Sequence, residues 1–107
     1  MLPSAVVASY RKDSVWIIEL HGCFTYYDLP ELTAATARGL GAQDGPIVFE
    51  LRHLSACDSP LLNHLLATLR LRHVVLAHVP WALKRLMEVT GTLDAFETTG
   101  DSASVVA

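Results

Sequence analysis

Short apolar blocks alternate along the chain with turn-forming residues, and the spacing of the apolar positions changes from block to block. Five blocks have the short, β-branched or alternating character of strands. These predicted strands are 5–11, 15–21, 47–51, 73–79 and a short edge strand near Phe96. The polar turn between the first two blocks predicts a β-hairpin, and Gly22 is expected to end its second strand.

Three further blocks have the apolar spacing and the start signals of helices. The first opens at Asp28, with Glu31 three residues on as in a capping box, and is expected to run to about Leu40 and stop at Gly41. The second opens at Asp58-Ser59-Pro60 and the third at Pro80. The second carries one apolar stripe at positions i, i+3, i+4 and i+7, formed by Leu62, Leu65, Leu66 and Leu69.

The order of these elements predicts the fold class. Strands that alternate with helices favour an α/β domain with parallel crossovers, here a mixed sheet of four to five strands packed by three to four helices. The chain has 107 residues, which fits one domain spanning 1–107. The small, polar segment 98–107 is expected to be a flexible tail.

The composition excludes several classes of protein. Hydrophobic residues make up 51% of the chain and charged residues 18%, below the usual ~25%, which excludes disorder as the main state. The formal charge of -3 argues against a nucleic-acid partner, since a phosphate-backbone binder needs a basic face. The longest apolar stretch, 74–83, falls well short of the ~20 residues of a membrane span.

The N-terminus and the cysteines indicate the compartment. The start of the chain has no basic region ahead of its short apolar run, unlike a secretory signal. Cys23 and Cys57 form no CxxC pair. We therefore expect a reduced, cytoplasmic protein.

The titratable residues offer little support for catalysis or metal binding. None of the five histidines lies in an HExxH or HxH spacing, so no metal and no cofactor is expected. Asp58, Ser59 and His64 resemble a hydrolase set in residue type only, because the chain has no GxSxG elbow. The sequence therefore predicts a protein that is not an enzyme.

For three features of the sequence, two interpretations remain open. Cys57 is either a buried thiol or a redox sensor whose pKa the following helix start lowers. Tyr26 and its aromatic neighbours either pack in the core or face a partner. Lys84 and Arg85 form either a solvated helix face or a weak anion site.

Three segments together resemble the STAS domain family, in the right order over 15–96. The stretch PIVFELRHLSACDSPLLNHLL resembles the family's central signature, a strand followed by an Asp-Ser pair that opens a helix. VPWALKRLMEVTGTLDAF resembles the marker of an amphipathic helix that ends in Thr-Gly-Leu and Phe. WIIELHGCFTYYDLPEL resembles the first marker, a strand that ends in Gly before a helix.

The resemblance implies a stand-alone bacterial anti-sigma factor antagonist, a regulator of transcription. Such a protein binds an anti-sigma factor, usually a GHKL-type serine kinase, until the kinase phosphorylates the serine of the Asp-Ser pair; a phosphatase resets it. Carried over to this chain, the phosphorylated residue is Ser59, with Asp58 beside it. The expected partner-binding residues are Thr25, Tyr26, Asp58, Ser59, Pro60 and Leu61.

The chain departs from the family pattern at three places. Pro60-Leu61 replaces the usual Ser-Gly, Thr25 stands where many members have Asp, and the segment from Asp58 to Pro80 is shorter than usual. The alternative is therefore a STAS interaction module of a transport or signalling assembly that phosphorylation does not switch. The sequence does not fix an oligomeric state.

The residues themselves predict a helix start at Ser59. Serine is a favoured N-cap and proline suits the first helical position. We expect the Ser59 hydroxyl to be exposed there, with Phe24, Tyr26, Pro60 and Leu61 forming an exposed apolar surface around it.

Overall fold

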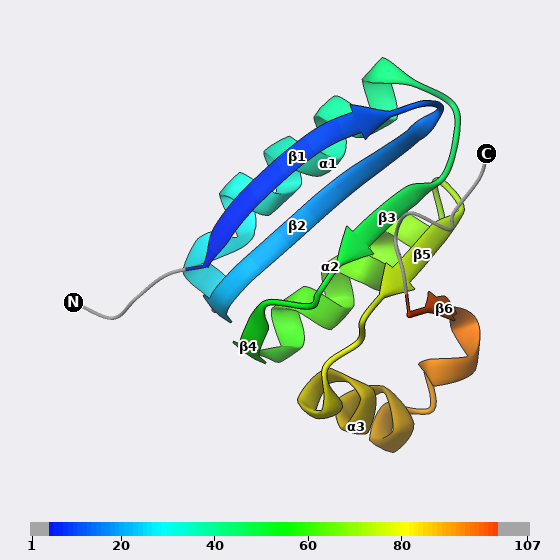
Figure 1. The fold of residues 1–107 in the computed structure, drawn as a ribbon. Coiled ribbons are helices and arrows are strands. Elements are labelled where there is room, and N and C mark those ends of the chain that lie inside the picture. The colour runs from blue at the N-terminus through cyan, green and yellow to red at the C-terminus, as the bar shows by residue number, and fades with distance from the viewer. Residues whose placement is uncertain (1–4, 101–107) are drawn as a thin grey trace.

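A mixed sheet with helices packed on one of its faces forms the fold (Figure 1). The computed structural model describes residues 5–100. The strands are β1 (Val6–Lys12), β2 (Val15–Phe24), β3 (Ile47–Glu50), β4 (Leu54–Cys57), β5 (Val74–Ala77) and β6 (Glu97–Thr99). The helices are α1 (Leu29–Ala42), α2 (Ser59–Leu69) and α3 (Trp81–Thr90), with short 3-10 turns η1 (Tyr26–Asp28) and η2 (Leu93–Ala95).

The strand order confirms the predicted α/β class and adds a strand. The main path is β1-β2-β3-β5-β6, in which β1 is antiparallel to β2 and the other neighbours are parallel. The strand near Phe96 forms as β6 at an edge of this path. The sheet of the described residues has six strands because β4, which is not among the predicted strands, pairs with β2.

Along one edge, the long strand β2 pairs first with β3 and then with β4. Its first half, from Trp16 to Glu19, pairs with β3, and its second half, from Gly22 to Phe24, pairs with β4. The prediction that Gly22 ends the strand is therefore wrong. Gly22 adopts a φ of 94° at a register shift, and the strand continues beyond it. A positive φ at this point needs a residue without Cβ.

The main core lies between the sheet and the helices. Figure 1 shows α1 and α2 behind the strands, with α3 beyond the end of β5. Side chains of β2 alternate between the two faces, and Trp16, Ile18 and Leu20 point into this core. Leu65 of α2 and Leu83 of α3 are fully buried in it, and the burial of Leu65 agrees with the predicted apolar stripe of α2.

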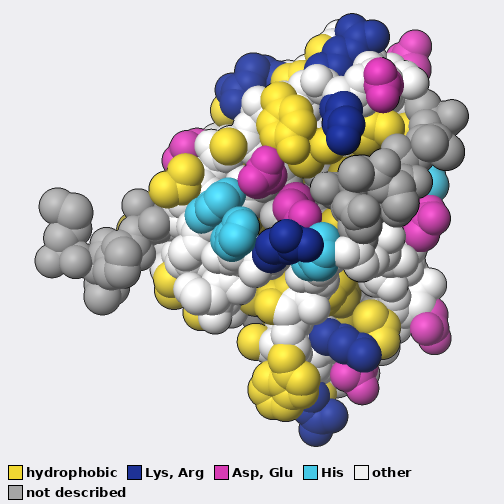
Figure 2. Space-filling view, in the orientation of Figure 1, with side chains coloured by type: hydrophobic (Ala, Val, Ile, Leu, Met, Phe, Trp, Pro, Cys, Tyr) yellow, Lys and Arg dark blue, Asp and Glu magenta, His cyan; other side chains and the backbone are white. Residues whose placement is uncertain are grey.

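The opposite face of the sheet carries no helix within residues 5–100. Its aliphatic cluster comprises Val15, Ile17, Val48, Val75 and Ala77. Figure 2 shows this face, with histidine and acidic side chains gathered around a basic one near its middle. Within the described part of the chain, no helix is long and apolar enough to cross a membrane.

Asp28 is the N-cap residue of α1, as predicted, but its carboxylate bonds to Thr25 and makes no capping hydrogen bond to α1. Two further predicted boundaries are wrong. Helix α1 continues through Gly41 to Ala42. Thr98 and Thr99, expected to begin the tail, belong to β6, because pairing with β5 extends the sheet by three residues. Positions 101–107 of the expected tail lie outside the described residues.

Candidate functional site

Ser59 is the first residue of α2 and is exposed. The expected N-cap was Ser59, but Asp58 is the N-cap: its backbone is extended, with φ -106° and ψ 168°, and its carbonyl accepts from Leu61 N at 3.1 Å. Neither side chain makes a hydrogen bond to another residue of 5–100. The Ser59 hydroxyl is therefore presented to solvent at a helix N-terminus.

The pairing of β2 with β4 brings Thr25 beside Asp58. The register aligns Phe24 with Cys57, so the residues that follow, Thr25 and Asp58, leave the sheet at the same edge. Because β4 was not foreseen, this adjacency was not predicted from the sequence, although both residues were assigned to the partner surface. The strand pairing thus gathers two of the predicted partner residues.

A short hydrogen-bonded turn holds Thr25. Its backbone N–H donates to Asp28 Oδ2 at 2.8 Å, and its hydroxyl donates to the same oxygen at 3.3 Å. Asp28 is 4% exposed, and its own N–H donates to the Thr25 carbonyl at 3.0 Å. Bonds in both directions fix the turn that carries Tyr26 toward α2.

Tyr26 and Pro60 line one hollow between the starts of α1 and α2. We call it the Tyr26–Pro60 groove; it has a volume of about 400 Å³. Its lining residues are Tyr26, Leu29, Thr33, Pro60, Asn63 and His64. Tyr26 is 66% exposed and Tyr27 87%, so these rings face solvent rather than the core. This exposure excludes packing in the core for both tyrosines and leaves the interpretation that they face a partner.

Two residues expected at this surface are buried. Phe24 and Leu61 are both 0% exposed. Phe24 closes β2 on the helix face, and Leu61 faces the core because it lies on the buried side of the first turn of α2. The prediction of an exposed apolar surface is therefore wrong at these two positions and right at Tyr26. Pro60 is half-buried.

His64 of α2 is half-buried against α1. Its Nε2 lies 2.9 Å from the Thr36 hydroxyl, and its ring meets Phe49 edge-on at 6.3 Å. Burial lowers the pKa of His64 below its ordinary value, which favours the neutral ring. Since its ring bonds Thr36 and not Ser59, the geometry of a hydrolase set is absent here.

Burial decides between the two readings of Cys57. Burial, followed by the charge of Asp58 and the nearby Cys23, raises the pKa of the Cys57 thiol. The redox reading needed a lowered pKa, because the thiolate is the reactive form. Cys57 is thus a half-buried structural thiol that packs against the core.

His21 and His78 lie within hydrogen-bonding distance of the acidic residues Glu19 and Glu50, respectively. His78 Nδ1 lies 2.9 Å from Glu50 Oε1, and Arg52 donates to His78 Nε2 at 2.9 Å. His21 stacks on His53 with ring centres 4.8 Å apart. Within residues 5–100, no group of three or more histidines, cysteines and carboxylates is placed to hold a metal ion.

Comparison with solved structures identifies the fold. An anti-sigma factor antagonist from Mycobacterium paratuberculosis superposes with a TM-score of 0.82 at 17% identity, over 92% of this chain and 88% of that one. The chain has the SpoIIAA-like fold. Bacillus SpoIIAA in its phosphorylated form superposes with a TM-score of 0.73 at 15% identity, over 92% of this chain and 94% of that one.

A further structure concerns the unmodified state of SpoIIAA. The anti-sigma factor antagonist SpoIIAA in its unphosphorylated form matches with a TM-score of 0.70 at 14% identity, over 91% of this chain and 89% of that one. Neither the family models nor the curated proteins compared with the chain match it. The likeness to the SpoIIAA-like fold therefore lies in the structure, over most of the chain.

Proposed function

We propose that this protein is an anti-sigma factor antagonist, a binding protein of the bacterial cytoplasm and not an enzyme. It holds an anti-sigma factor while Ser59 is unmodified and releases it when that factor, a GHKL-type serine kinase, phosphorylates Ser59; a phosphatase restores binding. The observation that carries the proposal is the exposed Ser59 at the start of α2, beside the Tyr26–Pro60 groove, in a SpoIIAA-like fold.

The proposed binding surface combines an apolar groove with few charges. Helix α2 contains no charged residue from Ser59 to Leu69, so Asp58 is the nearest charge along the chain. The exposed ring of Tyr26 and the half-buried ring of Pro60 offer the kind of apolar contact that protein interfaces use. We infer that the anti-sigma factor contacts five residues: Thr25, Tyr26, Asp58, Ser59 and Pro60. The buried Leu61 holds the first turn of α2 against the core.

Phosphorylation would change the charge of this surface without unfolding it. A phosphate at Ser59 adds about -1.5 to -2 charge units next to Asp58. Pro60 has no N–H and the Leu61 N–H already donates to the Asp58 carbonyl, so the dipole of α2 is what stabilises an anion at this helix start, and the helix start survives. A partner docked on apolar side chains then faces a phosphate that must be desolvated, and its affinity falls.

The test measures binding and phosphorylation of Ser59 variants by the cognate anti-sigma kinase. We expect Ser59→Ala to keep binding and to show no added phosphate by intact mass after incubation with kinase and ATP. Ser59→Asp should bind about tenfold or more weakly, because a charge is buried without a partner. Ser55→Asp is the matched control: Ser55 is exposed on β4 and should leave binding unchanged.

Two results would contradict the proposal. One is kinase labelling of Ser59→Ala as strong as that of the parent. The other is Ser59→Asp binding equal to the parent, which would favour the alternative, a STAS interaction module held in a transport or signalling assembly without a phosphorylation switch. A pull-down that recovers a transporter ATPase or permease in place of a GHKL-type kinase would point the same way.

A further inference from the structure

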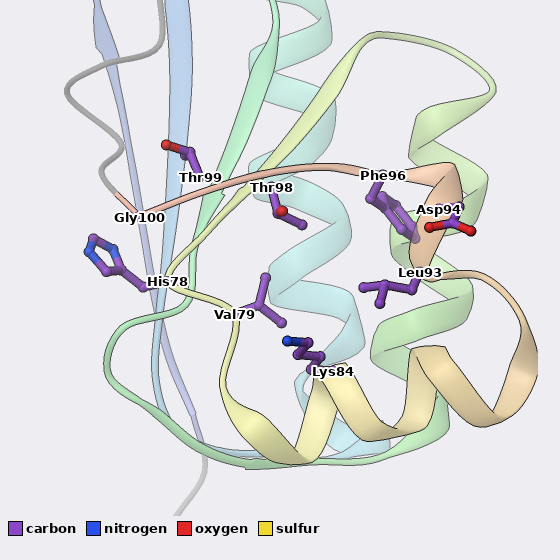
Figure 3. A pocket seen from close by; sticks show the side chains of 9 residues that line it. All are labelled: His78, Val79, Lys84, Leu93, Asp94, Phe96, Thr98, Thr99 and Gly100. Carbon is purple, nitrogen blue, oxygen red and sulfur yellow. The ribbon is translucent and has the colours of Figure 1, made fainter.

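A second hollow lies between the end of the sheet and α3, and it shares no lining residue with the Tyr26–Pro60 groove. We call it the β6–α3 cavity; its volume is about 580 Å³, within the ~300–1,000 Å³ of small-molecule sites. It is lined by His78, Val79, Lys84, Leu93, Asp94, Phe96, Thr98, Thr99 and Gly100 (Figure 3).

The cavity opens where ligand sites of α/β proteins are usually found. Strands β5 and β6 run parallel, and the residues that follow them, His78 and Gly100, stand at their carboxyl ends. His78 has a φ of 54°, uncommon for a residue with a Cβ, and its N–H donates to the Thr99 carbonyl at 2.9 Å. This bond ties the two strand ends together beside the cavity.

The lining of the cavity is mixed, with three apolar side chains and five polar ones. Val79, Leu93 and Phe96 pack against the core on their inner sides and line the cavity on their outer sides. Figure 3 shows the side chains of Val79, Lys84 and Thr98 turned toward the same space, with the His78 ring turned away from it. The surface thus combines an apolar wall, a hydroxyl and an ammonium group.

Within residues 5–100, the ammonium group of Lys84 has no acidic partner. The ion pairs found within residues 5–100 all involve histidines, and the side chain of Lys84 makes no hydrogen bond to another described residue. Asp94 is the one carboxylate in the lining, and Figure 3 shows it pointing away from Lys84. A cation beside an apolar wall selects an anion with an apolar body.

We propose that the β6–α3 cavity binds a small organic carboxylate. Its carboxylate pairs with Lys84 and accepts a hydrogen bond from Thr98, and its hydrocarbon body lies on Val79, Leu93 and Phe96. The site is distinct from the Tyr26–Pro60 groove, since the two hollows have no lining residue in common. Of the two readings of the basic residues of α3, this assigns Lys84 to an anion site and leaves Arg85 to solvent.

Hexanoate is the probe for the test, because it has one carboxylate and a short hydrocarbon chain. In an NMR titration we expect it to shift the amide signals of β6 and the start of α3 and to saturate with Kd near ~1 mM, as expected for a ligand of eight heavy atoms. Lys84→Met, which keeps the length of the stem, should weaken binding about fivefold, and 0.5 M salt should weaken it too.

Two further variants sharpen the test. Arg85→Met removes the neighbouring cation of α3, which does not line the cavity, and should leave the affinity unchanged. Asp94→Asn removes the one negative charge of the lining and should raise the affinity up to about twofold. Three results would each overturn the proposal: no saturation by hexanoate below ~20 mM, equal affinity in Lys84→Met, or equally tight binding of the uncharged hexan-1-ol.

Discussion

At the scale of single residues, polar side chains decide how the proposed binding surface is held. Asp28 serves the Thr25 turn rather than α1, and His64 serves the contact between α2 and α1. Asp28 accepts from the backbone N–H of Thr25, three residues before it, and His64 bonds to the hydroxyl of Thr36, 28 residues before it. The local Asp28–Glu31 spacing suggested a capping box, but a buried carboxylate bonds where the nearest unpaired N–H groups point.

His64 makes the stability of the fold depend on pH. Its pKa is lowered in the folded protein, so the unfolded chain binds the proton more tightly. The neutral ring's contribution to stability is complete above the unfolded pKa of about 6.5 and is lost as pH falls through that value toward the folded pKa. We expect the free energy of unfolding, measured in urea, to fall from pH 7.5 to pH 5.

Substitution of His64 isolates this effect. In His64→Gln the loss of stability between pH 7.5 and pH 5 should be smaller than in the parent. His53→Gln is the control, since His53 is exposed and stacks on His21. An unfolding free energy of His64→Gln that drops with pH as steeply as that of the parent would show that the ring does not titrate as the structure requires.

At the scale of elements, α1 lies so close to the sheet that one glycine is obligatory. A Cβ at Gly39 would overlap the ring of Trp16, whose Nε1 donates to the Ala35 carbonyl at 3.1 Å. Gly41, two residues later on the same helix, has no atom within 4 Å of its Cβ position. The helix therefore tolerates a methyl group at one glycine and not at the other.

Paired alanine substitutions test this close approach. Gly39→Ala should lower the free energy of unfolding by about 1–3 kcal/mol, since the Trp16 ring must move. Gly41→Ala should be neutral or stabilise by up to about 0.5 kcal/mol, because alanine favours helix. The free energies of unfolding of the two variants are measured in urea. Equal stability of the variants would mean that α1 does not contact Trp16 as described.

Much of the element pattern follows from the sequence, because the strong signals are local. The hairpin, α2 and α3 carry clear periodicity and start signals, and all form. Strand β4 was missed because its four residues include the small side chains of Ser55 and Ala56 and its pairing is with a strand far along the chain. The error at Phe24 follows, because β2 continues past Gly22 to pair with β4. The error at Leu61 has another cause, because Leu61 lies on the buried side of the first turn of α2.

At the scale of the whole molecule, the central strands should form its most stable part. Strands β2, β3 and β5 lie between other strands, and buried residues such as Ile18, Phe49 and Leu76 tie them to the helices. Strand β6 has three residues and pairs on one side within the described chain. Opening of β6 and α3 should therefore cost less than opening of the centre.

Hydrogen exchange measures this difference and its response to charge at Ser59. We expect the slowest amides in β2, β3 and β5, and faster exchange in β6. Ser59→Asp should leave the rates in the central strands unchanged within about twofold, because the anion is accommodated at the helix start. Broad acceleration of exchange in Ser59→Asp would show that charge at this position acts by unfolding.

The burial of Leu61 two residues after Ser59 has a consequence for signalling. Because the first turn of α2 is held against the core, under the proposed function a phosphate is added to Ser59 on a surface that does not rearrange. The protein then has two states, with and without the phosphate, and the lifetime of each is set by the enzymes that add and remove the phosphate and not by the protein's own motion. A partner binds or fails to bind according to that state, and the state persists after any single binding event.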